Sequence, residues 1–337
     1  MARHKIHCQF FSQESLLAAG CLDIRMSMAA AEEALRLYEE GDVIFPEKIV
    51  QIFNDETQER INCLPATFRK RKICGVKWVS VFPPNPVKYG IQNLSAAIIL
   101  SEIEHGLPIA IMDGTLCSNV RVGTMGAVAA KYLARTDSKT IGFIGAGEQS
   151  KMHMIAMKTA VPSLEHCRVA AKYEAEEAQF IAEMSPILPG VTFEACNTEL
   201  GKAVNGADII VTATSAQAPL LKADWFKPGA FYSHVGGWED EYAVAKQCDK
   251  IVCDDWETVK HRRRSAECIK TANWPTRTFT PTSSNLSQEK SRAAKAPMSG
   301  SISTPSGWRT STSPSRSQCT NGEWSPAWDR ILRCSRR

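Results

Sequence analysis

Long apolar runs are absent from the 337-residue sequence. No stretch reaches the roughly 18 consecutive apolar residues of a membrane-spanning helix. The first residues also lead into no apolar segment of the kind that a secretory signal carries. These absences argue against a membrane protein, and we expect the protein in the cytoplasm.

Regularly spaced cysteines are also missing, although the sequence contains twelve cysteines. None of them forms a C-x-x-C pair, and the order Cys8, Cys21, Cys63, Cys74, Cys117 shows no fixed spacing. Structural zinc sites and the disulfide frameworks of small secreted domains both use such spacing. We therefore predict no metal site and reduced, mostly structural thiols.

The net charge of +4 conceals an acidic body and a basic tail. Residues 1–261 carry 26 Lys and Arg against 32 Asp and Glu, whereas residues 262–337 carry 14 against 4. A basic segment can bind nucleic acid or a membrane surface, but this one is interspersed with Ser, Thr and Pro and follows no helix face. We expect neither nucleic acid nor membrane as a partner.

The length allows two domains of ordinary size, and residues 1–120 have the mixed pattern of an α+β domain. Apolar spacing predicts a helix over residues 13–41, which Gly41 ends. Runs rich in Val and Ile predict strands at 72–82, 94–101 and 108–112, of which the last two form a hairpin. A helix over residues 116–134 follows, and its many small residues suit close packing.

From residue 140 onward, short buried strands alternate with helices. This alternation is typical of a doubly wound parallel sheet and predicts a Rossmann domain over residues 121–262. The predicted strands are 140–144, 168–171, 191–195, 208–213, 231–235 and 251–253, and the predicted helices are 149–160 and 175–184. No internal repeat is visible.

A glycine-rich turn stands where the first of these strands meets its helix. Gly145 would permit the tight turn, Gly147 would let the main chain approach a pyrophosphate, and the helix would offer its N–H groups to the anion. Ser150 stands in place of the third glycine of the usual pattern. The context favours dinucleotide binding, and the alternative is a glycine turn in another α/β fold.

The end of the second strand bears on the choice between NAD and NADP. An acidic residue there would hold the ribose diol of NAD, but the sequence has Ala171 and Lys172, followed by Glu174. Lys172 favours NADP, whereas Glu174 leaves NAD open as an alternative.

Four ordered motifs carry a family resemblance. They are Gly75–Ser80, Leu107–Thr115, Arg121 with Gly126–Ala134, and Ile144–Ser150. Over about residues 12–262 the chain resembles the ornithine cyclodeaminase and μ-crystallin family.

The resemblance implies a smaller α+β substrate and dimerisation domain beside the Rossmann domain, a homodimer, and NAD or NADP as cofactor. It implies hydride transfer at the α-C–N bond of an amino acid, with conversion of L-ornithine to L-proline and ammonia as the first expectation. Related reactions are those of amino-acid dehydrogenases, aminocarboxyethyl-glutamate dehydrogenases and ketimine reductases. The crystallin branch implies another alternative, a non-catalytic dinucleotide binder.

The resemblance also assigns site residues. Lys77 and Arg121 match the family's carboxylate and amine contacts to the substrate, and Lys77 is also expected to be a catalytic residue. Lys48 stands at a position where relatives carry a basic residue, and it is expected to bind the substrate. A substrate carboxylate does need fixed cations, although each could instead be a surface ion-pair partner. The expected cofactor contacts are Gly145, Gly147, Gln149, Ser150, Lys172 and Thr214.

One departure concerns the reacting amine. Cyclodeaminases carry an Asp after a Gly-Gly pair, whereas this chain has Trp238 there. Asp240 is the expected substitute as a catalytic acid, with Glu239 and Glu241 as alternatives, and His234 is expected to be structural. This departure argues against ring closure with loss of ammonia, but it does not argue against hydride transfer alone.

The tail over residues 263–337 looks aberrant. Residues 262–337 contain 24 Ser and Thr and almost no periodic apolar positions, which predicts disorder. The segment can be back-translated with permitted codons and read one base earlier. The amino-acid sequence obtained in this way can be amphipathic and similar to sequences of the family. We therefore expect a frameshift near Arg262–Arg264, which an uninterrupted DNA reading frame would contradict.

Overall fold

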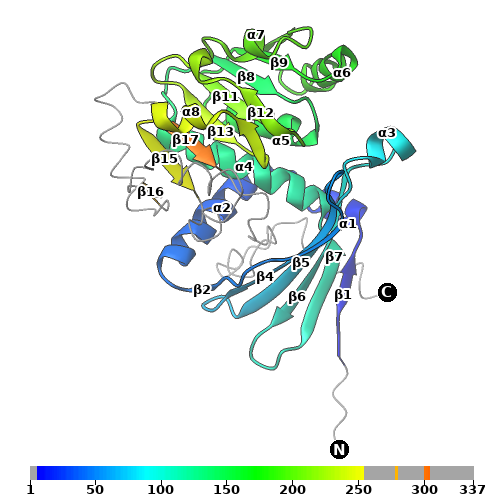
Figure 1. The fold of residues 1–337 in the computed structure, drawn as a ribbon. Helices are drawn as coiled ribbons and strands as arrows, with labels where there is room; N and C mark the ends of the chain where they lie inside the picture. Colours follow the sequence, from blue (N-terminus) through cyan, green and yellow to red (C-terminus); the bar gives the residue numbers. More distant parts are fainter. Residues whose placement is uncertain (1–5, 254–277, 280–299, 304–337) are drawn as a thin grey trace, which may run out of the picture. The chain divides into compact units, whose positions relative to one another are not determined.

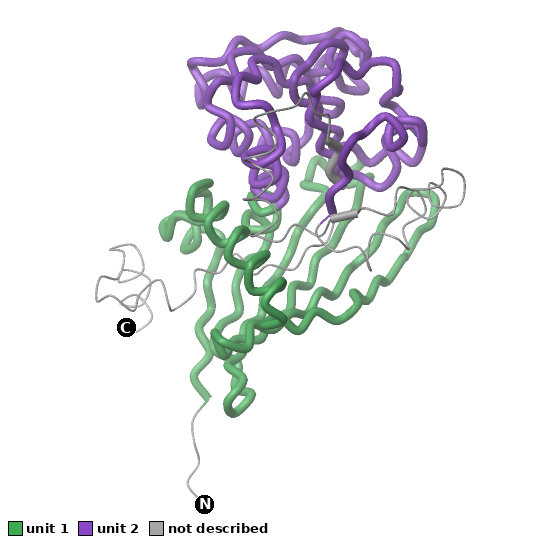
Figure 2. Tube along the Cα trace, turned by 90° about the vertical axis from the view of Figure 1, so that its left-hand side faces the viewer, with its two compact units in different colours: residues 1–121, 309–337 green, residues 122–308 purple. Residues whose placement is uncertain are grey.

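The computed structural model describes residues 6–253, 278–279 and 300–303. The chain divides into two compact units, one with residues 1–121 and 309–337 and the other with residues 122–308 (Figure 1, Figure 2). The first division falls next to the boundary expected after residue 120. Most of the predicted tail, including the expected frameshift, lies outside the described residues.

Unit 1 is built on one sheet with few helices. Its elements are β1 (Gln9–Phe11), α1 (Gln13–Ala18), α2 (Ile24–Glu39), β2 (Val43–Ile44), β3 (Ile49–Asn54), β4 (Glu59–Phe68), β5 (Ile73–Val81), α3 (Asn85–Tyr89), β6 (Leu94–Glu102), β7 (Pro108–Asp113) and the start of α4 (Thr115–Leu133).

The sheet of unit 1 buries one face and exposes the other. Its strand order is β1-β7-β6-β5-β4-β2, with β3 also paired to β4. On β5, Lys77 lies between Leu64 and Ile98 of the neighbouring strands, and both of these side chains are almost fully buried. The next residue, Trp78, points to the opposite face and is 44% exposed. The buried face packs in a cluster formed by Leu16, Ile98, Leu100, Ala110 and Cys117.

The predicted helix over residues 13–41 is wrong in one respect, because it is two helices. Gly20 has φ +81°, in the left-handed region that favours glycine, and it ends the first helix. Asp23 then caps α2, since its side chain accepts hydrogen bonds from the N–H groups of Arg25 and Met26. The predicted hairpin of β6 and β7 is confirmed.

Strands β1, β3 and β4 were not predicted. β3 is exposed along its whole length, so it lacks the alternation of apolar and polar residues that marks a strand. β4 contains Pro65, which is unusual inside a sheet.

Unit 2 begins within α4 and alternates strands with helices. Its further elements are β8 (Thr140–Ile144), α5 (Glu148–Ala160), β9 (His166–Ala170), α6 (Glu174–Met184), β10 (Thr192–Ala195), α7 (Leu200–Val204), β11 (Ile209–Thr212), β12 (Gln217–Leu221), the 3₁₀ turn η1 (Ala223–Trp225), β13 (Phe231–His234), β14 (Trp238–Asp240), α8 (Tyr242–Gln247), β15 (Lys250–Cys253), β16 (Thr278–Phe279) and β17 (Gly300–Ser303).

The main sheet of unit 2 is parallel and has the order β10-β9-β8-β11-β13-β17-β15-β16. The chain winds outward from β8 in both directions, so the predicted Rossmann-like doubly wound sheet is confirmed. β16 and β17 lie inside the segment for which the sequence predicts disorder, so the prediction is wrong for these two strands. Within the described part of the chain, no helix is long and apolar enough to cross a membrane.

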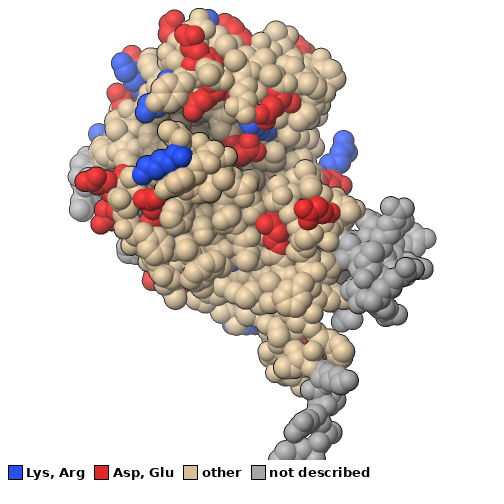
Figure 3. Space-filling view, turned by 90° about the vertical axis from the view of Figure 1, so that its right-hand side faces the viewer, with Lys and Arg blue, Asp and Glu red and all other residues tan. Residues whose placement is uncertain are grey.

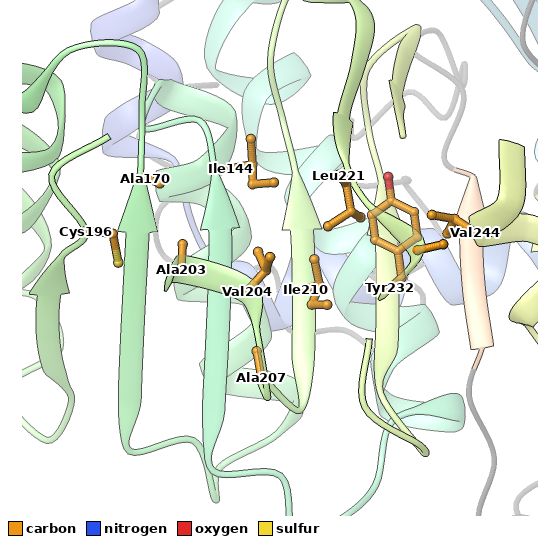
Figure 4. Packing of buried hydrophobic residues seen from close by; sticks show 11 residues of the cluster. Ile144, Ala170, Cys196, Ala203, Val204, Ala207, Ile210, Leu221, Tyr232 and Val244 are labelled. Atoms are coloured by element: carbon orange, nitrogen blue, oxygen red, sulfur yellow. The ribbon is translucent and has the colours of Figure 1, made fainter. Parts of the chain in front are cut away.

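Helices cover both faces of this sheet. On one face, Ile144, Ile210 and Tyr232 lie side by side on three neighbouring strands and pack with residues of α7 and α8 (Figure 4). On the other face, Phe143 meets Phe180 of α6 with ring centroids 5.7 Å apart. Burial on both faces explains why these strands are apolar runs in the sequence rather than alternating patterns.

Close contacts at glycine bring the layers together. A Cβ on Gly123 of α4 would lie 2.7 Å from the main chain of Met152 in α5. A Cβ on Gly142 of β8 would lie 2.2 Å from the carbonyl oxygen of Ala203 in α7. The prediction that the small residues of α4 suit close packing is therefore confirmed.

Charged side chains are scattered on the face of the molecule drawn in Figure 3, where acidic and basic groups are interspersed among uncharged ones. Ion pairs among the described residues include Lys227 with Asp208 at 2.5 Å.

We predict that Gly142→Ala lowers the free energy of unfolding by about 1–3 kcal/mol, because its methyl group would overlap a main-chain oxygen. Gly190→Ala is the matched control, since a Cβ there meets no atom of the described part of the chain within 4 Å. Urea unfolding followed by circular dichroism compares the two variants. Equal unfolding midpoints would contradict the packing argument.

Candidate functional site

The glycine turn of unit 2 lies at the point where the sheet reverses its strand order. β8 has β9 on one side and β11 on the other, and ligands of such sheets bind beyond the carboxyl ends of the strands at this point. Gly145 follows β8 directly and has φ +101°. A Cβ on Gly145 would lie 2.6 Å from the carbonyl oxygen of Ala213, which follows β11. Glycine is therefore required at this position by the protein itself.

Gly147 differs from Gly145, because no atom of the described residues requires it to be glycine. It is exposed, forms the N-cap of α5 with ordinary extended angles, and a Cβ there would meet nothing within 4 Å. The space beside its main chain is open at the start of a helix of 13 residues. This arrangement fits the pyrophosphate of a dinucleotide, which would use that space and the N–H groups of the helix.

The other expected cofactor residues lie around this turn. Ser150 is buried and donates its hydroxyl proton to the carbonyl oxygen of Gly145 at 2.7 Å, so it braces the turn rather than facing solvent. Gln149 is partly buried in the first turn of α5. Thr214 follows β11, and its methyl group would be 3.0 Å from a Cβ on Gly145. The structure thus brings together Gly145, Gly147, Gln149, Ser150 and Thr214.

A buried carboxylate holds the segment that contains Thr214. Glu239 on β14 is fully buried and accepts hydrogen bonds from the hydroxyl groups of Thr212 and Thr214, at 2.9 and 2.7 Å. It also accepts from the main-chain N–H groups of Thr214 and Gly236. Burial raises the pKa of Glu239 above its ordinary value, although these hydrogen bonds act in the opposite direction.

His234 lies between two buried acids. Its Nε2 is 3.6 Å from Oε2 of Glu239, and its Nδ1 is 3.7 Å from Oδ1 of Asp240. Asp240, the expected catalytic acid, is fully buried on β14. In this position Asp240 is placed to interact with His234, whose expected structural role fits its burial at the end of β13.

In unit 1 two cations come together on the buried side of the sheet. Lys77 of β5 and Arg121 of α4 influence one another electrostatically, and Arg121 is only 6% exposed. Burial lowers the pKa of Lys77 well below its ordinary value, and the positive charge of Arg121 lowers it further. Among the described residues, no carboxylate forms an ion pair with Lys77, so an anion bound beside Lys77 would offset its buried charge.

The two remaining expected residues lie elsewhere. Lys48 is partly buried in the link between β2 and β3, and β4 separates that link from β5. Lys172 is exposed just after β9, and its Nζ lies 5.2 Å from the ring centroid of Tyr173. Lys172 thus stands at the carboxyl end of the second strand, where the ribose of a dinucleotide is held in such folds.

Sequence reasoning missed Glu177, which acts on the same end of the sheet. This fully buried residue of α6 accepts hydrogen bonds from the N–H groups of Ala171, Asn197 and Thr198, at 3.0, 2.8 and 2.7 Å. Asn197 and Thr198 both have positive φ angles. Glu177 therefore fixes the loop after β10 to the end of β9. An acidic residue among the apolar positions of a predicted helix was the available signal.

A profile described as the Ornithine cyclodeaminase/mu-crystallin family matches residues 18–246. An alanine dehydrogenase from Archaeoglobus fulgidus is 31% identical over 240 residues, which are 70% of this chain and 70% of the relative. The N-((2S)-2-amino-2-carboxyethyl)-L-glutamate dehydrogenase of Staphylococcus aureus is 27% identical, over 76% of this chain and 77% of the relative. Among solved structures, an archaeal alanine dehydrogenase dimer with bound NAD superimposes with a TM-score of 0.75 at 26% identity and covers 90% of this chain and 92% of its own.

We predict that Glu239→Gln lowers the free energy of unfolding by about 1–3 kcal/mol at neutral pH. The NH₂ group of the new amide would face a main-chain N–H group of Thr214 or Gly236, which is also a donor. The raised pKa also gives a pH dependence. The folded protein holds the Glu239 proton more tightly than the unfolded chain, so this contribution to stability decreases as the pH rises from about 4.5.

The difference in unfolding free energy between the parent and Glu239→Gln, measured from pH 4 to 8, isolates this contribution. We expect the advantage of the parent to shrink as the pH rises. A constant difference over that range would mean that Glu239 titrates alike in both states.

Proposed function

Because the chain belongs to the ornithine cyclodeaminase/mu-crystallin family, we propose that it is an NAD(P)-dependent oxidoreductase acting on the α-C–N bond of a small amino or imino acid. In the oxidative direction an amino acid and NAD(P)⁺ give an imino acid, NAD(P)H and a proton. The observation that carries the proposal is the Lys77–Arg121 pair, which lies in the same chain as a glycine turn suited to a dinucleotide.

The cation pair supports a carboxylate substrate. Lys77 lies between buried apolar side chains. Its protonated, charged form is disfavoured by burial and by the positive charge of Arg121. A carboxylate bound beside Lys77 would favour its charged form and raise the pKa of Lys77 toward its ordinary value. Such fixed cations orient the α-carbon of an amino acid, which is what the reaction requires of the protein.

The open space at Gly147 and the N–H groups of α5 support the cofactor. Gly145, Gln149, Ser150 and Thr214 would shape the same turn around the pyrophosphate. When bound, the nicotinamide accepts or returns the hydride. Lys172 would face the ribose end, where its charge favours the additional phosphate of NADP.

Plain hydride transfer is better supported than ring closure. Trp238 occupies the place after the Gly-Gly pair, and Asp240 is fully buried beside His234. A carboxyl group in that position has no exposed surface from which to serve a reacting amine. We therefore place amino-acid dehydrogenation or imino-acid reduction ahead of the conversion of ornithine to proline.

The deciding experiment is a screen of amino acids with NAD⁺ and NADP⁺, followed at the nicotinamide absorbance band. We expect reduced cofactor with at least one small amino acid. Ornithine tests the alternative, since a cyclodeaminase yields proline and ammonia without net cofactor reduction. Cofactor binding by calorimetry without turnover of any amino or imino acid would instead support a non-catalytic binder.

We predict that Lys77→Met lowers kcat/KM for the amino acid by roughly 30- to 1,000-fold, the equivalent of about 2–4 kcal/mol for a lost buried charge contact. The cofactor affinity should change little, because the glycine turn is intact. Lys222→Met, an exposed lysine of unit 2, is the matched control and should keep parental kinetics. Parental kcat/KM in Lys77→Met would rule out carboxylate binding at this pair.

We also propose that the chain forms a homodimer through the exposed face of the unit 1 sheet. The solved alanine dehydrogenase with which the chain shares its fold is a dimer. Trp78 stands on the exposed face beside Cys63 and Ala97, and Ile99 of β6 lies on the same face. A second copy of this chain would remove these apolar side chains from water.

Trp78→Lys tests the dimer, because it places a charge in the middle of that face. Light scattering during gel filtration should give a dimer for the parent and for Ile187→Lys, an exposed apolar position of unit 2. Trp78→Lys should give a monomer. A dimer in all three proteins would place the interface elsewhere.

A further inference from the structure

A buried carboxylate joins the carboxyl ends of two neighbouring strands of unit 2. Glu177 of α6 is fully buried, and its Oε1 accepts hydrogen bonds from the N–H groups of Ala171 and Thr198, at 3.0 and 2.7 Å. Its Oε2 accepts a hydrogen bond from the N–H group of Asn197 at 2.8 Å. Ala171 follows β9, and the other two residues lie in the loop after β10. One side chain therefore holds both segments in a fixed relation.

The loop that Glu177 holds has a strained main chain. Asn197 and Thr198 have φ angles of +52° and +64°, in the left-handed region that favours glycine. Asparagine adopts this region more readily than most residues, but threonine is branched at Cβ and rarely enters it. Strain of this kind persists only where the surrounding structure fixes it, and it is concentrated at sites that bind ligands. The hydrogen bonds to Glu177 supply the restraint.

The side chains displayed at this edge of the sheet suit the adenosine half of a dinucleotide. Lys172 and Tyr173 follow β9 directly, Tyr173 is 54% exposed, and Nζ of Lys172 lies 5.2 Å from its ring centroid. Asn197 and Thr198 are exposed at the end of the neighbouring strand. An aromatic face can stack on a base, and a cation and polar groups can bind phosphate and ribose. Nucleotides bind beyond this edge in such sheets.

We propose that Glu177 is a positioning residue for the cofactor, because it holds the loop of Asn197 and Thr198 beside Lys172 and Tyr173 in the arrangement that receives the adenosine end. Glu177 has no exposed surface and would act only through the loop. A loop that is already ordered binds without the free-energy cost of ordering it. The proposal rests on dinucleotide binding, which is part of the proposed function, and is independent of the amino-acid substrate.

Glu177→Gln tests the proposal, because it removes the restraint with little change in volume. The amide has one oxygen in place of two, so its NH₂ group would face at least one main-chain N–H group, which is also a donor. If the released loop keeps the binding arrangement for about 1–10% of the time, the Kd of the probe rises about 10- to 100-fold. Calorimetry on the full chain measures this change. The probe is ADP-ribose or its 2′-phosphate, whichever the parent binds more tightly.

Asp208→Asn is the matched control for stability. The Asp208 carboxylate also accepts hydrogen bonds from two main-chain N–H groups, those of Lys139 and Thr140 at 2.8 and 2.9 Å, but it does so at the amino-terminal end of the same sheet. We expect this variant to lose stability and to keep the parental Kd for the probe. A Kd that rises equally in both variants, or an unchanged Kd in Glu177→Gln, would overturn the proposal.

Hydrogen–deuterium exchange of the parent, with and without the same probe, needs no variant and shows where the probe binds. We expect slower exchange at residues 171–174 and 196–199, and no change at residues 185–190 between α6 and β10. Slower exchange at the glycine turn alone would overturn this inference and leave dinucleotide binding in place. No change anywhere, together with no heat of binding, would overturn dinucleotide binding itself and this inference with it.

Discussion

The main constraint on unit 2 is the close approach of main chain to β8. Gly142 lets α7 lie directly on the strand, and Gly145 lets the chain turn against the end of β11. With any larger residue at these two positions, the layers would move apart at the place where the strand order reverses. The turn, the start of α5 and Thr214 all take their positions from this contact. Glu239 then holds the far side of the same region by joining Thr212, Thr214 and Gly236 through one carboxylate.

In unit 1 the main constraint is a cation, Lys77, on the apolar side of the sheet. Lys77 shares its face of β5 with the buried Val79, and its neighbours on both adjacent strands are apolar. This placement costs free energy in the absence of an anion, and binding of an anion recovers it. The unfavourable environment of Lys77 therefore does not stabilise the fold, and it agrees with the proposed role of Lys77 in binding a substrate carboxylate.

The sequence predicted the elements whose signals are local. β8, the glycine turn and α5 follow one another within about one βα unit, and the apolar runs of a sheet buried on both faces are visible without tertiary information. The proposed cofactor residues Gly145, Gly147 and Ser150 could be named from the sequence for the same reason. The break at Gly20 and Asp23 had a local signal too, but the helical spacing on either side concealed it.

The elements that were missed depend on the surrounding structure. β3 and β4 pair with each other and carry no clear alternation, so only the finished sheet shows them as strands. The role of Glu239 could not be seen either, because its partners Thr212, at the end of β11, and Thr214, in the loop that follows, lie 27 and 25 residues earlier in the chain.

Glu177 has a consequence for how the length of this domain can vary. One carboxylate joins the end of β9 to two consecutive left-handed residues after β10. Loops at the surface usually tolerate insertions, but an added residue at Asn197 would separate amides that a single side chain must reach together. The turn at residues 185–190, between α6 and β10, carries no such restraint from Glu177. Insertions, tags or fused segments are better accommodated there than in the loop that follows the neighbouring strand.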